Sequence, residues 1–227
     1  MTARTALVTG GGGGIGAAIC QGLADAGHRV AVADLAVERA RQVAADIDGV
    51  AVELDVTDPA SVAAAVAGAA EAFGPIEICV SCAGWDELRP FLDTDEAFQA
   101  KVIEINLAGP MRVTRAVLPA MLQGSFGRIV NIASDAGRVG SSLESVYSGA
   151  KGGVIAFTKT IAREFARHGI SANTICPGPT DTPLLDAITE ASADAERVIA
   201  GMTKAVPMRR LGQPDDVAPA VVFLASD

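Results

Sequence analysis

The chain has 227 residues, of which half are apolar and a fifth are charged, so it is long enough to bury the core of one large domain. Its formal net charge of −9 at pH 7 argues against a nucleic-acid partner, because phosphate neutralisation needs clustered Lys and Arg. It has no run of about 18 apolar residues that would span a bilayer, and its N-terminus lacks a signal-peptide pattern. We therefore expect a cytoplasmic protein with neither a nucleic-acid nor a membrane partner.

The first strand-like run, residues 5–9, leads into the glycine-rich stretch "VTGGGGGIG" at residues 8–16, and a helical pattern follows. Between a strand and a helix, backbone without Cβ atoms can approach a dinucleotide's pyrophosphate, and the helix N-terminus offers N–H donors. A P-loop is excluded because no GK[ST] ending follows. Two registers fit the run: GxGxxG on Gly11, Gly13 and Gly16, or GxxxGxG on Gly10, Gly14 and Gly16.

Asp34 ends the second apolar run, residues 29–34. A carboxylate at this place can accept hydrogen bonds from both ribose hydroxyls of an adenosine, and it would repel a 2′-phosphate. The glycine loop offers no Arg or Lys for such a phosphate, so we expect NAD rather than NADP. Two alternatives stay open at this point: Asp34 as a plain loop acid or helix cap, and a methyltransferase, which also begins with a glycine-rich turn and a ribose-binding acid.

Two further strand-like runs follow at 50–55 and 76–81, and the second carries the CxxC pair Cys79 and Cys82. That spacing occurs in redox and zinc sites, but side chains three apart in a strand point to opposite faces. The chain has no second CxxC and only two His. We therefore expect core cysteines and no metal site.

The second half of the chain combines a long helical stretch, from about 95 to 122, with strand-like runs at 128–134 and 170–176. Pro110 predicts a break or kink in the helical stretch. Ser134 ends the fifth run, at the sheet edge where ligands bind in alternating α/β proteins. The region from about 179 to 206 has no strand-like run, and we expect short helices there that form a lid over a site.

Tyr147 and Lys151 are four residues apart in a helical pattern, so their side chains share one face of that helix. A phenol has an ordinary pKa near 10, which is high for proton transfer at neutral pH. A neighbouring ammonium favours the phenolate, so we expect Lys151 to lower the pKa of Tyr147, the only tyrosine in the chain.

The alternation of strand-like and helical patterns predicts a single-domain α/β fold over residues 1–227. It is a doubly wound, Rossmann-type parallel sheet with helices on both faces. No Pro/Ser-rich linker or change in composition marks a second domain.

Taken together, these motifs resemble those of the short-chain dehydrogenase/reductase family. The matching segments occur in the family's order: "TGGGGGIG" at 9–16, "DVTD" at 55–58, "AG" at 83–84, Asn106 in "INLAG", Ser134, the YxxxK pair Tyr147 and Lys151, and "PGPTDT" at 177–182. The resemblance implies hydride transfer between a nicotinamide and a secondary alcohol or ketone. It also implies a homodimer or homotetramer.

The resemblance also implies residue roles. Tyr147 would be the general acid/base, Lys151 would bind the nicotinamide ribose, and Ser134 would orient the substrate oxygen. Asn106 would hold a water of the proton relay. The cofactor would contact Gly10, Gly12, Gly13, Gly14, Ile15 and Gly16 with its pyrophosphate, Asp55 and Val56 with its adenine, Cys82, Ala83 and Gly84 with a ribose, and Pro177, Gly178, Thr180 and Thr182 with its nicotinamide amide and phosphates.

The chain departs from the family pattern in two places. Ser81 and Cys82 stand where the family has two asparagines, so any side-chain amide bond in that turn is lost or replaced by a hydroxyl. The sequence stops at "VVFLASD", where relatives continue into a last strand, so we expect a sheet without that strand.

The substrate is expected to lie against residues that follow the fourth and fifth strands and in the lid: Trp85, Asp86, Arg138, Val139, Leu184 and Leu185. The segments that carry them most resemble members that oxidise 2-hydroxycyclohexanecarboxyl-CoA, and less closely the 3-oxoacyl carrier-protein reductases. We therefore expect a hydroxyacyl-CoA as substrate, with an alicyclic acyl group as one form. A 3-oxoacyl thioester reductase and a non-catalytic NAD-binding protein of the same fold are the alternatives.

Overall fold

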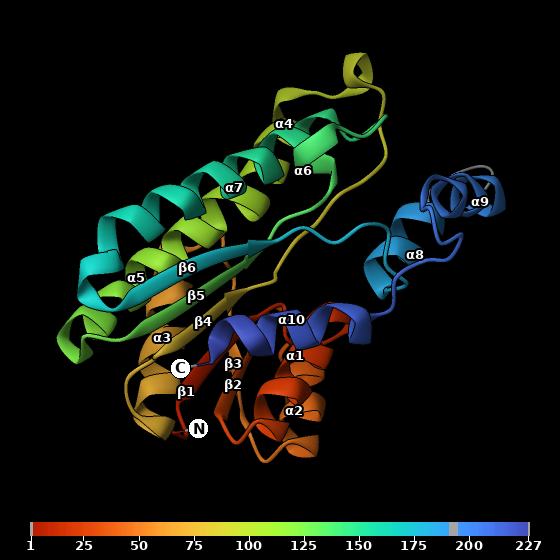
Figure 1. Cartoon of the computed structure of the whole chain (residues 1–227). Helices are drawn as coiled ribbons and strands as arrows, with labels where there is room; N and C mark the ends of the chain where they lie inside the picture. Colours follow the sequence, from red (N-terminus) through yellow and green to blue (C-terminus); the bar gives the residue numbers. More distant parts are fainter. Residues whose placement is uncertain (1, 191–194, 227) are drawn as a thin grey trace.

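The fold is built around one parallel sheet whose six strands all run the same way (Figure 1). The computed structural model describes residues 2–190 and 195–226. The strands lie in the order β3-β2-β1-β4-β5-β6. Their bounds are β1 Thr5–Thr9, β2 Arg29–Asp34, β3 Val50–Glu53, β4 Ile78–Ser81, β5 Gly127–Ile132 and β6 Ile170–Ile175.

The strand order reverses at β1, whose neighbours are β2 on one side and β4 on the other. At its carboxyl end Thr9 pairs with Ala33 of β2 and Ser81 of β4, so three chain segments leave the sheet at the same edge. All five residues of β1 are buried, because helices cover both faces there. Such a switch in strand order opens a crevice in which α/β proteins bind ligands.

One face of the sheet is covered by α1 (Gly14–Asp25), α2 (Val37–Asp46) and α10 (Pro214–Ala225), which bury small and branched apolar side chains against it. The other face is covered by α3 (Pro59–Phe73), α5 (Gly109–Gly124) and α7 (Ser145–Phe165). Cys79 packs into the core on the side of α3, α5 and α7, whereas Cys82 packs against the core on the opposite face. The predicted doubly wound α/β fold is confirmed.

The predicted break near Pro110 is a short π-helical segment, Glu104–Ala108, between α4 (Glu96–Ile103) and α5. Pro110 lies in the first turn of α5, directly after the π-helical segment, and its missing N–H cannot bond to a carbonyl of the preceding turn. Such π turns are frequent at functional sites.

At the carboxyl edge, α6 (Ala136–Val139) follows β5, and α8 (Pro183–Glu190) and α9 (Ala195–Ala205) follow β6. In Figure 1 α8 and α9 lie to one side of the sheet, at the end of the segment that leaves β6. An isolated parallel β-bridge between Thr180 and Gly212 joins the segment before α8 to the segment after α9. The 3₁₀ turns η1 (Phe91–Asp93) and η3 (Ala166–His168) complete the elements.

Several strands are shorter than predicted. The third strand ends at Glu53 instead of residue 55, and Ser134 lies two residues beyond the end of β5 instead of ending that strand. Both differences place polar residues in the loops at the carboxyl edge, where they are free of the sheet's ladder. Within the described residues β6 is the last strand of the sheet and lies on its edge.

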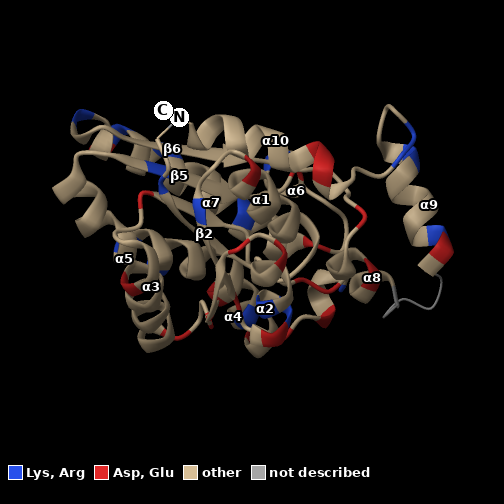
Figure 2. Cartoon of the chain, turned by 90° about the horizontal axis from the view of Figure 1, so that it is seen from below, with Lys and Arg blue, Asp and Glu red and all other residues tan. Residues whose placement is uncertain are grey.

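Charged side chains are spread over many elements of the described chain, with acidic and basic residues interspersed (Figure 2). Among the described residues no helix is both long and apolar enough to cross a membrane.

Candidate active site

The glycine loop between β1 and α1 is shaped by backbone clearance. An added Cβ at Gly16 would lie 2.0 Å from the Gly10 carbonyl oxygen, and Gly10 has a positive φ of 66°. Gly14 also has a positive φ, 52°. At Gly13 an added Cβ would meet nothing within 4 Å. Gly10, Gly14 and Gly16 thus have steric or backbone reasons to be glycine and Gly13 has none, which favours the GxxxGxG register that the sequence alone left undecided. Gly11 is crowded as well, since an added Cβ would lie 2.8 Å from the Val32 side chain.

Asp34 fastens the glycine loop from the end of β2. Its Oδ2 accepts a hydrogen bond from the Gly12 N–H at 3.0 Å, and its Oδ1 accepts one from Ala36 N–H at 2.9 Å. The second bond is a local turn contact, because the N-cap of α2 is Ala36, which has no side-chain cap hydrogen bond. The role of Asp34 at a ribose stays a prediction. Arg39 Nη2 lies 3.8 Å from Asp34 Oδ1. From the sequence, we considered cations only within the glycine loop and did not predict Arg39, which lies in the first turn of α2.

The loop after β4 is held by the end of β1. The Thr9 hydroxyl accepts hydrogen bonds from the Cys82 and Ala83 N–H groups at 3.1 and 3.2 Å. An added Cβ at Gly10 would lie 2.7 Å from Ala83 N, so the two loops pack backbone to backbone. The Thr9 hydroxyl thus holds the main chain of this turn in place, although Ser81 and Cys82 replace the two asparagines of the family pattern.

Asn106 lies in the π-helical segment and is fully buried. Its Nδ2 donates hydrogen bonds to the carbonyl oxygens of Trp85, at 2.7 Å, and Val102, at 2.9 Å, while its Oδ1 accepts one from Trp85 N–H at 3.3 Å. An added Cβ at Gly84 would lie 3.1 Å from Asn106 Oδ1 and 3.7 Å from Lys151 Nζ. The π turn therefore places Asn106 against the loop after β4, close to Lys151. Its expected role in holding a water stays a prediction.

Ser134, Tyr147 and Lys151 come together at the carboxyl edge, beside β5. Lys151 Nζ donates a hydrogen bond to the Ile132 carbonyl oxygen at 3.0 Å and lies 5.5 Å from the centroid of the Tyr147 ring. The hydroxyls of Ser134 and Tyr147 are within hydrogen-bonding reach of each other. The three side chains thus face one small volume, as the predicted spacing requires.

The pKa of Tyr147 is raised in this structure, which is opposite to the expected direction. Burial of the phenol is the main cause, and the carboxylates of Glu144 and Asp86 add to it, while the Ser134 hydroxyl acts against it. Burial lowers the pKa of Lys151 to about 8. The sequence spacing predicted the contact with Lys151 but not the desolvation, which depends on distant segments that cover the phenol.

Asp86 is the most unusual side chain near Tyr147. It is 5% exposed, and burial together with the neighbouring acids raises its pKa to about 8. The acids are Glu144 and Glu87, of which Glu144 lies within hydrogen-bonding reach of the Asp86 carboxyl. Sequence reasoning placed Asp86 on the substrate side but did not connect it with Glu144, which is far away in the chain.

The other expected substrate residues are spread more widely. The Trp85 ring packs edge-on against Phe98, with the ring centroids 5.8 Å apart, and Lys101 Nζ lies 3.5 Å from the Trp85 ring centroid. In the lid, Leu185 is buried and Leu184 is half-buried.

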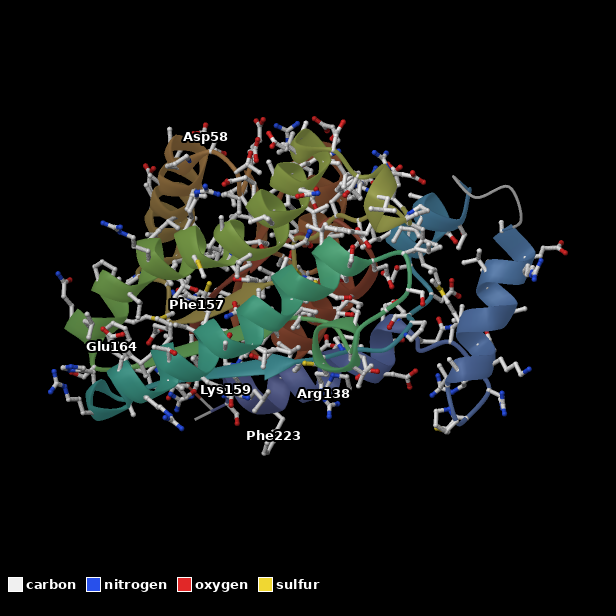
Figure 3. The ribbon with its side chains drawn as sticks, turned by 90° about the horizontal axis from the view of Figure 1, so that it is seen from above. Asp58, Arg138, Phe157, Lys159, Glu164 and Phe223 are labelled. Atoms are coloured by element: carbon white, nitrogen blue, oxygen red, sulfur yellow. The ribbon has the colours of Figure 1, made fainter. Side chains whose placement is uncertain are left out.

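Arg138 and Val139 lie on the exposed turn α6. Arg138 also lines a groove between α7 and β6, and Figure 3 shows it on the same side of the molecule as Lys159 of α7. These two residues remain predictions for substrate binding.

The remaining expected cofactor residues lie in loops at the same edge. Asp55 accepts hydrogen bonds from the Thr57 N–H at 2.8 Å and hydroxyl at 2.7 Å, which lower the pKa of Asp55. Val56 is buried against Gly109. The Thr182 side chain packs 3.3 Å from the position of a Cβ on Gly14, so the segment after β6 reaches the glycine loop. Pro177, Gly178, Thr180 and Ile15 lie in these same two segments.

These features match what is found in known proteins. The family profile described as short chain dehydrogenase matches residues 4–193. Oxidoreductase UcpA of Escherichia coli (strain K12) is 40% identical over 235 residues, covering 100% of this chain and 89% of that protein.

Two further comparisons extend this similarity. Acetoacetyl-CoA reductase of Allochromatium vinosum is 40% identical, covering 99% of this chain and 92% of that protein. A variant of actinorhodin polyketide ketoreductase, solved with NADPH, has a TM-score of 0.93 and is 34% identical, covering 99% of this chain and 90% of that one.

Proposed function

The chain belongs to the short-chain dehydrogenase family and is an oxidoreductase that acts on CH–OH groups with a nicotinamide cofactor, and from this premise we propose that it is an NAD-dependent dehydrogenase of hydroxyacyl thioesters. The observation that carries the chemistry is the convergence of Ser134, Tyr147 and Lys151 at the carboxyl edge of β5. A phenol, a hydroxyl and an ammonium around one volume are the groups needed to move a proton to or from an alcohol oxygen.

The residues present fit a dinucleotide. The backbone of Gly10 and Gly16 leaves no room for Cβ atoms, and the loop they form leads into the N-terminus of α1, which favours a pyrophosphate. Asp34 is the expected partner of the adenosine ribose. When bound, the cofactor would supply or accept the hydride.

Tyr147 would donate its phenolic proton to the carbonyl oxygen in reduction and take it back in oxidation. Ser134 would hold the same oxygen through its hydroxyl. The Lys151 ammonium, anchored on the Ile132 carbonyl, would stabilise the phenolate that is left after donation. Asn106 would connect Lys151 to solvent through a water, because its side chain lies next to the loop that approaches Lys151 Nζ.

The preference for NAD rests on Asp34, whose charge would repel a 2′-phosphate. Arg39 favours the alternative, because its guanidinium lies beside Asp34 and is 57% exposed, so it could pair with such a phosphate if Asp34 turned aside. Asp34 is held by two backbone N–H groups, which opposes that movement and supports NAD.

The proposal of a thioester substrate is based on the segments around Trp85, Arg138 and Leu184. The similarity to an acetoacetyl-CoA reductase supports that substrate class. The described parts of the predicted lid, residues 179–190 and 195–206 with α8 and α9, would lie over the acyl chain. Residues 191–194 of the predicted lid lie outside the described residues. The 3-oxoacyl thioester reductase is the same chemistry run in the other direction.

The test is an assay of the purified protein with NAD and, separately, NADP against hydroxyacyl-CoA esters, sugars, steroids and short alcohols. We expect turnover of the thioesters with NAD at a kcat/KM at least tenfold above that with NADP. Turnover of the sugars or short alcohols alone would overturn the thioester assignment. NAD binding without turnover of any substrate would favour the non-catalytic alternative.

We also propose a homodimer or homotetramer that uses α7, as the family resemblance implies. Exposed apolar side chains on the neighbouring segments, Ile103 at 41% and Met111 at 37%, support a buried interface on this side of the sheet. Light scattering after size exclusion gives the number of subunits, and a monomer at micromolar concentration would contradict the proposal.

A further inference from the structure

Two acidic side chains from distant segments meet beside Tyr147. Asp86 follows β4, and Glu144 precedes α7. The loops that carry them are joined by a backbone hydrogen bond from the Arg89 N–H to the Leu143 carbonyl oxygen at 2.9 Å. This bond holds the two loops side by side, and Asp86, Glu144 and Tyr147 line one small pocket between them.

The Asp86 carboxyl has an unusual environment for an acid. Asp86 is only 5% exposed to solvent. No described side chain or backbone group donates a hydrogen bond to its Oδ2. A buried carboxylate oxygen without a donor is costly. Two carboxyl groups can form a hydrogen bond with each other only if one of them carries a proton, and a shared proton removes most of this cost.

The backbone next to Glu144 is also unusual. Leu143 has a φ of 69°, in the left-handed region that residues other than glycine rarely adopt. The Glu144 carboxylate additionally accepts a hydrogen bond from the Ser141 hydroxyl. The chain thus turns tightly at a bulky residue to bring Glu144 to the Asp86 carboxyl.

Charged and titratable groups reach Tyr147 from two sides. From its own helix and the preceding turn come Lys151 and Glu144, and from the loop after β4 come Asp86 and the Cys82 thiol. The more distant charges are paired elsewhere: Glu87 with Arg89, Asp135 with Arg138, and Lys101 with the Trp85 ring. Within the described residues, Asp86 and Glu144 are the carboxylates that act on the phenol.

We propose that Asp86 and Glu144 hold one proton between them at neutral pH and that, after this proton has left to solvent, their two negative charges oppose ionisation of the Tyr147 phenol. They are positioning residues for proton transfer, since they act through Tyr147 without touching the reacting atoms. The pair keeps Tyr147 in its acid form, which donates a proton to a ketone, up to a higher pH than the phenol and Lys151 alone would allow. Its effect on turnover rests on the proposed function, but its effect on the phenol does not.

The lone tyrosine makes a direct test possible. Tyr147 is the only tyrosine of the chain and the single Trp does not ionise, so the near-ultraviolet phenolate absorbance reports Tyr147 alone. The unliganded full chain is titrated with alkali while far-ultraviolet circular dichroism follows the fold. The variants are Asp86→Asn, Glu144→Gln and the double variant, and the control is Asp135→Asn, whose carboxylate faces Arg138.

Removing a negative charge near a phenol favours the phenolate, so phenolate must appear at lower pH. We expect a displacement of about one pH unit in each single variant and a larger one in the double variant, with the fold still native. Asp135→Asn should titrate as the wild type does. If Asp86→Asn fails to fold, Glu144→Gln carries the test, because Glu144 is only half-buried.

The same variants have a kinetic readout. The acidic limb of kcat/KM for alcohol oxidation should move to lower pH by about the same amount, because oxidation needs the phenolate. Phenolate that appears at the same pH in the wild type and in all three variants overturns the proposal. A changed phenol titration without any dehydrogenase turnover supports the carboxyl pair and contradicts only the proposed function.

Discussion

The two halves of the sheet's carboxyl edge are built on different physical principles. Beside β1 and β2 the site is formed by main-chain atoms, and Gly10 and Gly16 pack so closely that there is no room for a Cβ atom on Gly16. Beside β4 and β5 it is made of ionisable side chains, and burial moves the pKa values of Tyr147, Lys151 and Asp86 away from their ordinary range. The comparison teaches that substitutions beside β1 and β2 should act through steric fit, whereas substitutions beside β4 and β5 should act through charge and depend on pH.

The largest expected effect is on the backbone half. Gly16→Ala places a Cβ 2.0 Å from the Gly10 carbonyl oxygen, so the loop must move. We expect the free energy of unfolding to fall by about 3 kcal/mol and NAD affinity to fall by at least about a hundredfold. Chemical denaturation and calorimetric titration measure the two quantities.

Gly13→Ala is the matched control for the fold, because its Cβ would meet nothing within 4 Å and its backbone is extended. Its free energy of unfolding should stay within about 0.5 kcal/mol of the wild type. Equal destabilisation of the two variants would show that backbone clearance does not shape this loop.

Asn106→Ala tests the junction between the two halves. It removes the donor to the Trp85 and Val102 carbonyl oxygens inside a buried site, so we expect a loss of about 2 to 3 kcal/mol in the free energy of unfolding. Gln99→Ala is the control, because this half-buried amide on α4 makes one hydrogen bond, to Thr94, and should cost less than about 1 kcal/mol. A cost for Asn106→Ala no larger than for the control would contradict the role of the π turn.

Asp34→Ser asks whether charge matters in the backbone half as well. Without the carboxylate, Arg39 is released to meet a 2′-phosphate, so the ratio of kcat/KM for NAD to that for NADP should fall by at least about tenfold. Adding Arg39→Gln in the same chain should remove the gain for NADP. An unchanged ratio in Asp34→Ser would show that the preference is set elsewhere.

The smallest expected effect is a pH dependence of stability in the ionisable half. The folded-state pKa of Asp86 is raised to about 8 from an ordinary value of 3.8, so between these values the folded chain binds more protons than the unfolded chain. Wild-type stability that stems from this group is therefore present at low pH and is lost as pH rises towards 8. Asp86→Asn cannot ionise and should not show this loss.

Urea denaturation at pH 7 and pH 8 measures this difference. Relative to the wild type, Asp86→Asn should gain about 1 kcal/mol between the two pH values, since one proton contributes at most about 1.4 kcal/mol per pH unit. A difference between the two proteins that stays constant with pH would show that Asp86 is ionised throughout.

The same contrast explains what the sequence could and could not predict. The alternation of strands and helices, the glycine loop, Asp34 and the Tyr147–Lys151 spacing are local patterns, and the sheet, its helix layers and the meeting of these two side chains follow from them. The glycine register was not predictable, since it depends on how close Gly10 and Gly16 come in space. The raised pKa of Tyr147 was not predictable either, because its main cause is burial of the phenol in the folded chain, and Asp86 reaches it from the distant loop after β4.

The central claim is that Tyr147 carries the proton in hydride transfer to or from a nicotinamide. Its most direct test is the turnover of Tyr147→Phe with NAD and a hydroxyacyl-CoA, measured together with its NAD affinity. We predict a fall in kcat of about a thousandfold and an NAD affinity within about twofold of the wild type, because the phenolic oxygen acts only on the transferred proton. Unaltered turnover in this variant would contradict the account.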